Sequence, residues 1–154
     1  MSTYTATVRW HSKESREGFT KGQYSRAHEW AFDGGTVVPA SASPHIVPAP
    51  WSDPAGVDPE EAFIASLASC HMLFFLDFAR RAGLVVENYL DEAEGVLDKR
   101  EDGKMAMARV TLRPKVAFSG TNPPTPEEIE ELHHRAHDAC FIANSVTTEV
   151  TVEH

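Results

Sequence analysis

The sequence has little cysteine and no cluster of positive charge, and both features limit the classes of function that it can have. Only two of its 154 residues are cysteine, Cys70 and Cys140, a number close to chance usage. Its 14 lysines and arginines are spread among 23 acidic residues, which leaves a net charge of −9. Because phosphate backbones bind clustered Lys and Arg, we expect no nucleic-acid partner.

An export signal is also missing. Residues 1–6 contain neither a charged segment nor an apolar one, so we expect a cytoplasmic protein. In that reducing compartment a structural disulfide between Cys70 and Cys140 would be unusual, whereas a transient catalytic or sensing disulfide is compatible with it.

Glycine-rich loops of the Walker or Rossmann type are absent, and we expect no cofactor. The length suits one domain over residues 1–154, and the composition, 42% hydrophobic and 24% charged, is that of an ordinary globular protein.

The most informative stretch that is present begins at Asp58 and ends at Gly83. Asp58 can cap a helix, Pro59 suits its first position, and Glu61 can complete a capping box. Apolar residues then occupy nearly every face, which predicts a helix enclosed by other elements. We expect no membrane partner, since the stretch is short and charged at both ends.

Polar residues of this helix fall close to one line: Ser66, Ser69, Cys70 and Asp77. A thiol on that line would face whatever cavity the line borders. The alternative is that Cys70 is only a small core residue, because free cysteine is among the most buried side chains.

The rest of the chain predicts an α+β fold. Alternating apolar residues predict strands over 3–11, 23–32, 105–118 and 146–152, and a mixed segment over 85–98 pairs with the third of these. Residues 12–18 read as a polar turn, and residues 36–51, with four prolines, as an extended connection that can hold an edge strand. A capping signal at Thr125 opens an amphipathic helix through Cys140.

This order lacks regular βαβ alternation. It predicts two small antiparallel sheets around the buried central helix. One chain has trouble covering a helix that is apolar on all sides, so we expect a homodimer in which two such helices pack together.

Cys70 and Cys140 both face inward on predicted helices, so a thiol redox cycle follows if they meet. Cys70 then needs a cation to hold it as thiolate, because a mid-helix position lacks the free amides of a helix start. The candidates are Arg26, predicted on a strand, Arg16 in a turn, and His45 in the proline-rich connection. We select Arg26, since a strand holds a side chain more rigidly than a turn does.

Glu60 could orient that arginine through a bidentate bond. Ten residues of straight helix separate Glu60 from Cys70 by about 15 Å, so one guanidinium reaches both only where the helix is bent or interrupted.

A metal site is the alternative to a thiol site. His133 and His137 stand at i and i+4, a spacing that suits zinc, but the glutamate of the metalloprotease motif is absent. We therefore expect no metal.

The stretch from Asp58 to Cys70, with Ala136–Cys140 and the terminal strand, resembles the osmotically inducible protein C and organic hydroperoxide resistance (OsmC/Ohr) family. The resemblance implies an intertwined homodimer, Cys70 as peroxidatic cysteine, Cys140 as resolving cysteine, and Glu60 as partner of the active-site arginine. Two features depart from the family: Phe141 stands where a proline is common, and the glycine-arginine turn is not recognisable.

The resulting hypothesis is a thiol-dependent peroxidase in oxidative-stress defence. Organic hydroperoxides are its substrates, Arg26 stabilises the thiolate of Cys70, and an external thiol, in the family a dihydrolipoyl group, is the reductant. The alternative is a ligand-binding or thiol-sensing dimer of the same fold without turnover.

Overall fold

A computed structural model describes all 154 residues, which cluster into two compact units, Met1–Ala62 and Phe63–His154. The boundary falls in the first turn of the long helix α2 (Pro59–Arg81). The single domain predicted over 1–154 stays a prediction.

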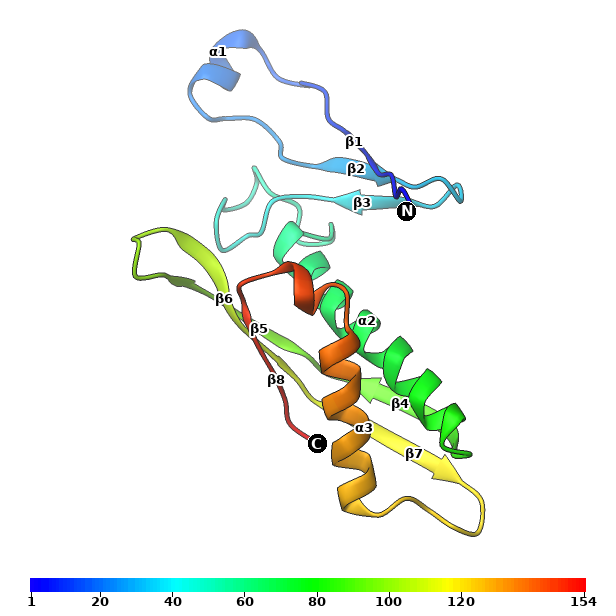
Figure 1. The fold of residues 1–154 in the computed structure, drawn as a ribbon. Helices are drawn as coiled ribbons and strands as arrows, with labels where there is room; N and C mark the ends of the chain where they lie inside the picture. The colour runs from blue at the N-terminus through cyan, green and yellow to red at the C-terminus, as the bar shows by residue number, and fades with distance from the viewer. The chain divides into compact units, whose positions relative to one another are not determined.

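The first unit is a three-stranded antiparallel sheet with β2 in the middle (Figure 1). Its strands are β1 (Thr7–Arg9), β2 (His28–Ala31) and β3 (Val37–Ala40). The predicted hairpin of the first two strands is confirmed, although both are shorter than expected. A short helix, α1 (Arg16–Thr20), begins where the sequence predicts only a turn, because the Ser15 hydroxyl accepts the Gly18 amide hydrogen and caps it.

The proline-rich segment after β2 supplies the edge strand that its composition allows. β3 pairs with β2 on one side only and contains Pro39, which an edge strand tolerates. The segment then folds back, so that Ala40 bridges Val57 and the Ser41 amide donates to the Val57 carbonyl (3.1 Å). This return delivers the chain to α2.

The boundaries of α2 follow its sequence signals. The Asp58 carboxylate accepts the Glu61 amide hydrogen (2.8 Å) and Glu61 accepts that of Asp58 (3.1 Å), so the predicted capping box is confirmed. Gly83 ends the helix with a φ of +76°, a conformation that glycine adopts without strain.

The chain covers one side of α2. Within one chain its buried residues form a single stripe: Leu67, His71, Phe75 and Ala79. The opposite side is open, and Leu73 is 60% exposed. One chain therefore leaves part of the helix uncovered, as predicted, and its cover by a second copy stays a prediction.

The prediction that α2 is too short to span a membrane is wrong. The helix has 23 residues, and its length and composition alone would allow it to cross a bilayer. Core helices of soluble proteins meet the same criterion, and the buried stripe of α2 packs against the strands of the second unit.

The second unit contains five strands and the helix α3 (Pro126–Ala139), capped by Thr125 and Glu128 as predicted. The strands are β4 (Val85–Asp91), β5 (Glu94–Lys99), β6 (Met105–Leu112), β7 (Pro114–Ser119) and β8 (Glu149–Val152). β4 pairs with β7, and the sheet β5-β6-β8 contains the predicted hairpin. β8, which follows the short helix η1 (Ala143–Ser145), pairs parallel with β6.

The α+β architecture is thus as predicted, with three small sheets where the sequence predicts two. Two apolar clusters hold the second unit together. Leu67 of α2 packs on Val110 and Leu112 of β6, whereas Phe75 and Ala79 pack on α3. α2 and α3 therefore lie side by side (Figure 1).

Candidate active site

The two cysteines lie close together in the second unit. Cys70 is in the middle of α2 and partly exposed, and Cys140 is buried. Cys140 is the residue that ends α3, with an extended conformation, so its predicted place within a helix is wrong by one residue. Both thiols are free. The Cys70 side chain lies close enough to Cys140 to help raise the pKa of its thiol, so the structure brings the predicted pair together.

Cys70 opens into a groove of about 580 Å³ with mainly apolar walls. All four residues of the predicted polar line border it, so this line is confirmed. The lining residues are Ser66, Ser69, Cys70, Leu73, Phe74, Asp77, Phe141 and Ile142. Phe74 and Phe141 meet edge to face with ring centroids 5.0 Å apart. A small apolar molecule entering the groove would meet the Cys70 sulfur.

The two thiols have different surroundings. Burial raises the pKa of Cys140 to about 11, and the neighbouring Cys70 sulfur contributes to that rise. The Ala143 amide of η1 donates to the Cys140 sulfur (3.4 Å) and partly opposes it. Cys140 is therefore almost entirely protonated at neutral pH.

Arg26 lies in the first unit, two residues before β2, so its predicted position on a strand is wrong. It is nevertheless held firmly. Its Nη1 donates to the carbonyls of Gly22 (2.8 Å) and Tyr24 (2.6 Å), and its guanidinium stacks 3.6 Å from the Tyr24 ring centroid. It forms no ion pair, and it lines a hollow of about 480 Å³ beside Trp10 and Phe19.

The other predicted site residues, Glu60, Arg16 and His45, are partly or fully exposed. Glu60 is partly buried in the first turn of α2 and forms no ion pair with Arg26. α2 shows no break between Glu60 and Cys70. Arg16 begins α1 and is exposed, as is His45.

Of the two candidate zinc residues, His133 is buried and hydrogen-bonded to another histidine. His133 is 2% exposed, and its Nδ1 hydrogen-bonds to Nε2 of His71 at 3.0 Å, within the core. His137 lies one turn further along α3 and is partly exposed. No group of three or more His, Cys, Asp or Glu side chains is placed to hold a metal ion.

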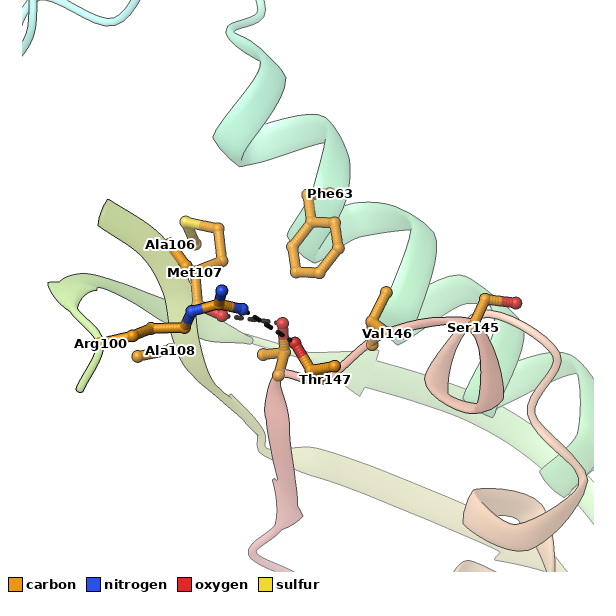
Figure 2. Close-up of a pocket in the computed structure, with 9 residues that line it drawn as sticks. Phe63, Arg100, Ala106, Met107, Ala108, Ser145, Val146 and Thr147 are labelled. Carbon is orange, nitrogen blue, oxygen red and sulfur yellow. Dashed lines mark hydrogen bonds between the residues drawn. The ribbon is translucent and has the colours of Figure 1, made fainter. Parts of the chain in front are cut away.

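A second hollow in this unit, of about 470 Å³, contains Arg100, Met107, Phe63 and Thr147 (Figure 2). Arg100 is neutralised by Asp102, at 2.6 Å, and its Nη1 also reaches the Thr147 hydroxyl at 3.4 Å. The hollow contains no cysteine or histidine, so it is a weaker candidate than the groove at Cys70.

Sequence reasoning missed Leu73, Phe141 and Ile142 as lining residues, and the hydrogen bond of His71 to His133. Leu73 follows Cys70 by three residues, and that helical spacing could have placed it near the thiol. The neighbours of Cys140 gave no such signal, because they face Cys70 only once α3 packs on α2.

Comparison with known proteins supports the family resemblance. A family model described as OsmC-like protein matches residues 52–154. A solved OsmC-like protein of unknown function from Vibrio cholerae is 56% identical, with a TM-score of 0.96 and a match covering 99% of both chains. A search of the curated proteins found no match.

Two solved hydroperoxide resistance proteins are more distant. The organic hydroperoxide resistance protein of Elizabethkingia anophelis is 19% identical with a TM-score of 0.71, and the match covers 100% of this chain and 97% of that chain. OhrB of Bacillus subtilis is 23% identical with a TM-score of 0.65, covering 97% of each chain. These two likenesses show a shared fold.

The buried histidine pair predicts how stability depends on pH. Burial is the main cause that lowers the pKa of His71 to about 4 and that of His133 to about 3. His137 and His154 contribute to the shift of His71, and His71 and His154 to that of His133. Unfolded histidine binds a proton at about pH 6.5. The folded state is therefore fully favoured above pH 6.5, and it loses stability as the pH falls toward 4 because only the unfolded chain gains protons.

We expect the free energy of unfolding, measured with urea, to fall by roughly 6 kcal/mol between pH 7 and pH 4 relative to a His71→Leu/His133→Leu variant, about 3 kcal/mol from each imidazole. Carboxylates contribute to both proteins and cancel in the difference. Equal pH slopes in the two proteins would contradict this.

Proposed function

Because the chain belongs to the OsmC-like family, we propose that it is a thiol-dependent peroxidase that reduces organic hydroperoxides. The observation that carries the proposal is that two free thiols, Cys70 and Cys140, lie together, and that Cys70 lines an apolar groove. Residue pairs of this kind support a disulfide cycle without a metal or cofactor. The apolar walls favour an organic substrate over hydrogen peroxide.

In the proposed reaction the Cys70 thiolate attacks the terminal oxygen of the hydroperoxide. The O–O bond breaks, the released alkoxide takes up a proton and leaves as an alcohol, and Cys70 becomes a sulfenic acid. The Cys140 thiolate then attacks the Cys70 sulfur, which forms the S–S bond and releases the oxygen as water. An external dithiol, for which a dihydrolipoyl group is the candidate, reduces the disulfide by exchange.

Arg26 is the proposed electrostatic partner of Cys70, and Glu60 is proposed to orient it. The side chain of Arg26 has no carboxylate partner, and its hydrogen bonds all come from Nη1, so Nε and Nη2 remain to bind an anion. A fixed guanidinium would stabilise both the thiolate and the negative charge on the departing oxygen.

We also propose a homodimer in the cytoplasm. The side of α2 opposite its buried stripe exposes Leu73, and Phe141 beside it is 71% exposed. Open apolar surface of this kind is typical of a subunit interface.

The alternative function, a thiol-sensing or ligand-binding dimer, draws support from the raised pKa of Cys140, which would make disulfide formation slow.

We expect the wild-type protein to consume cumene hydroperoxide with dihydrolipoamide or dithiothreitol as reductant. Cys70→Ser should be inactive because the nucleophile is lost, and Cys140→Ser should accumulate a sulfenic acid that dimedone traps for mass spectrometry. Oxidation of wild-type Cys70 without turnover by any dithiol would instead favour the sensor.

Loss of the guanidinium should slow the reaction of Cys70 with hydroperoxide. We expect Arg26→Ala to lower kcat/KM by about a hundredfold, the effect of removing one preorganised donor. Arg26→Lys should recover only part of this, because lysine lacks the planar fork. The exposed Arg16→Ala serves as control and should match wild type; the opposite ranking would move the role to Arg16.

Charge on the open face of α2 should disrupt the dimer. We expect Leu73→Glu to shift the protein toward monomer in analytical ultracentrifugation, because the carboxylate would lie in an apolar interface. Val85→Glu, at a comparable exposure of 59% on β4, is the matched control. A Leu73→Glu protein that stays dimeric would place the interface elsewhere.

A further inference from the structure

A buried histidine pair joins the two helices that carry the cysteines. His71 directly follows Cys70 on α2, and His133 lies on α3, which ends at Cys140. Their ring nitrogens are 3.0 Å apart, the ring planes differ by 10°, and the residues are only 1% and 2% exposed. The other ring nitrogens, Nδ1 of His71 and Nε2 of His133, are buried and have no hydrogen-bond partner in the protein.

This is the one hydrogen bond between α2 and α3. The rest of their contact is mainly apolar, through Phe75, Ala79 and Ala136, with the Arg135 guanidinium 4.3 Å from the Phe78 ring centroid. Apolar contacts carry little directional preference, whereas a hydrogen bond requires a narrow range of distance and angle. Breaking it would leave two imidazoles buried without partners, which is costly. The pair therefore selects one position of α3 along α2.

Cys140 follows any movement of α3. Its amide donates to the carbonyl of His137 (3.2 Å), and its sulfur accepts the Ala143 amide hydrogen (3.4 Å). Cys70 is likewise fixed to α2 by its place within the helix. A shift of one helix against the other would change the separation of the two sulfurs directly.

We propose that His71 and His133 are positioning residues, which hold Cys140 against Cys70 for disulfide formation. The inference rests on the proposed function and adds a role to it. In the step concerned, the Cys140 thiolate attacks the Cys70 sulfenic acid, the S–S bond forms, the S–O bond breaks, and the oxygen leaves as water with a proton. Misplacement by about 1 Å can slow such a step a hundredfold.

The test follows two steps separately by rapid quenching and mass spectrometry: oxidation of Cys70 by cumene hydroperoxide, and disulfide formation. In His133→Leu and in His71→Leu/His133→Leu we expect Cys70 oxidation within about twofold of wild type and disulfide formation at least about tenfold slower. His133→Asn, whose amide can occupy the place of Nδ1, should stay within about threefold.

The double variant separates positioning from stability. Replacing both partners of a buried hydrogen bond by apolar groups can be nearly neutral for stability. If the pair were merely structural, the double variant would regain the wild-type rate of disulfide formation, and the inference would be overturned.

Phe75→Leu provides a matched control. Phe75 is fully buried one turn further along α2 and stacks on His133 at 4.3 Å, so its truncation weakens the same interface but keeps the hydrogen bond. It should lower the urea midpoint and leave disulfide formation within about twofold. Slowing equal to that of His133→Leu would show that the rate follows stability alone.

A peroxide-free arm keeps this inference distinct from the proposed function. Cys70 is converted to its mixed disulfide with thionitrobenzoate, and Cys140 then displaces thionitrobenzoate, which absorbs visible light; Cys140→Ser blocks the release. If hydroperoxide fails to oxidise wild-type Cys70 but release slows in the leucine variants, the peroxidase fails and the positioning role stands. Equal release rates in all variants would overturn the positioning role.

Discussion

Burial of one stripe of α2 is the constraint on which the second unit depends. Leu67 packs against the sheet that contains β6, and Phe75 and Ala79 pack against α3, so both apolar clusters share this helix. Cys70 lies at the margin of the stripe, next to the buried His71 and one turn from the exposed Leu73. Its thiol is consequently anchored by the core and open to a substrate at the same time.

The groove at Cys70 contains no cation of its own. Its one charged lining residue is Asp77, whose carboxylate is paired with Arg80 and Arg81, each at 2.7 Å. Those ion pairs hold the pKa of Asp77 below its usual range, with the Arg80 hydrogen bond as the main cause. A thiolate beside an acidic, largely apolar wall needs positive charge from another segment. Arg26, which has no carboxylate partner, meets that need in the proposed mechanism.

Local signals in the sequence were sufficient to predict the two long helices, α2 and α3. Two capping boxes, Asp58–Glu61 and Thr125–Glu128, mark where α2 and α3 begin. They can be recognised in the sequence because capping involves residues only three positions apart. Helical spacing likewise places Ser66 and Asp77 with Cys70 along one groove. Long-range features were not predictable in this way. The parallel pairing of β8 with β6 and the bond of His71 to His133 join residues about 40 and 62 positions apart, which no periodicity encodes.

The unequal burial of the two thiols implies an order of events. Cys70 borders the groove, so in the proposed reaction the hydroperoxide meets it first, whereas Cys140 is covered and has a pKa of about 11. At pH 7 roughly one Cys140 in ten thousand is then a thiolate. Disulfide formation would be the slow step unless the sulfurs are already aligned, since alignment compensates for a scarce nucleophile.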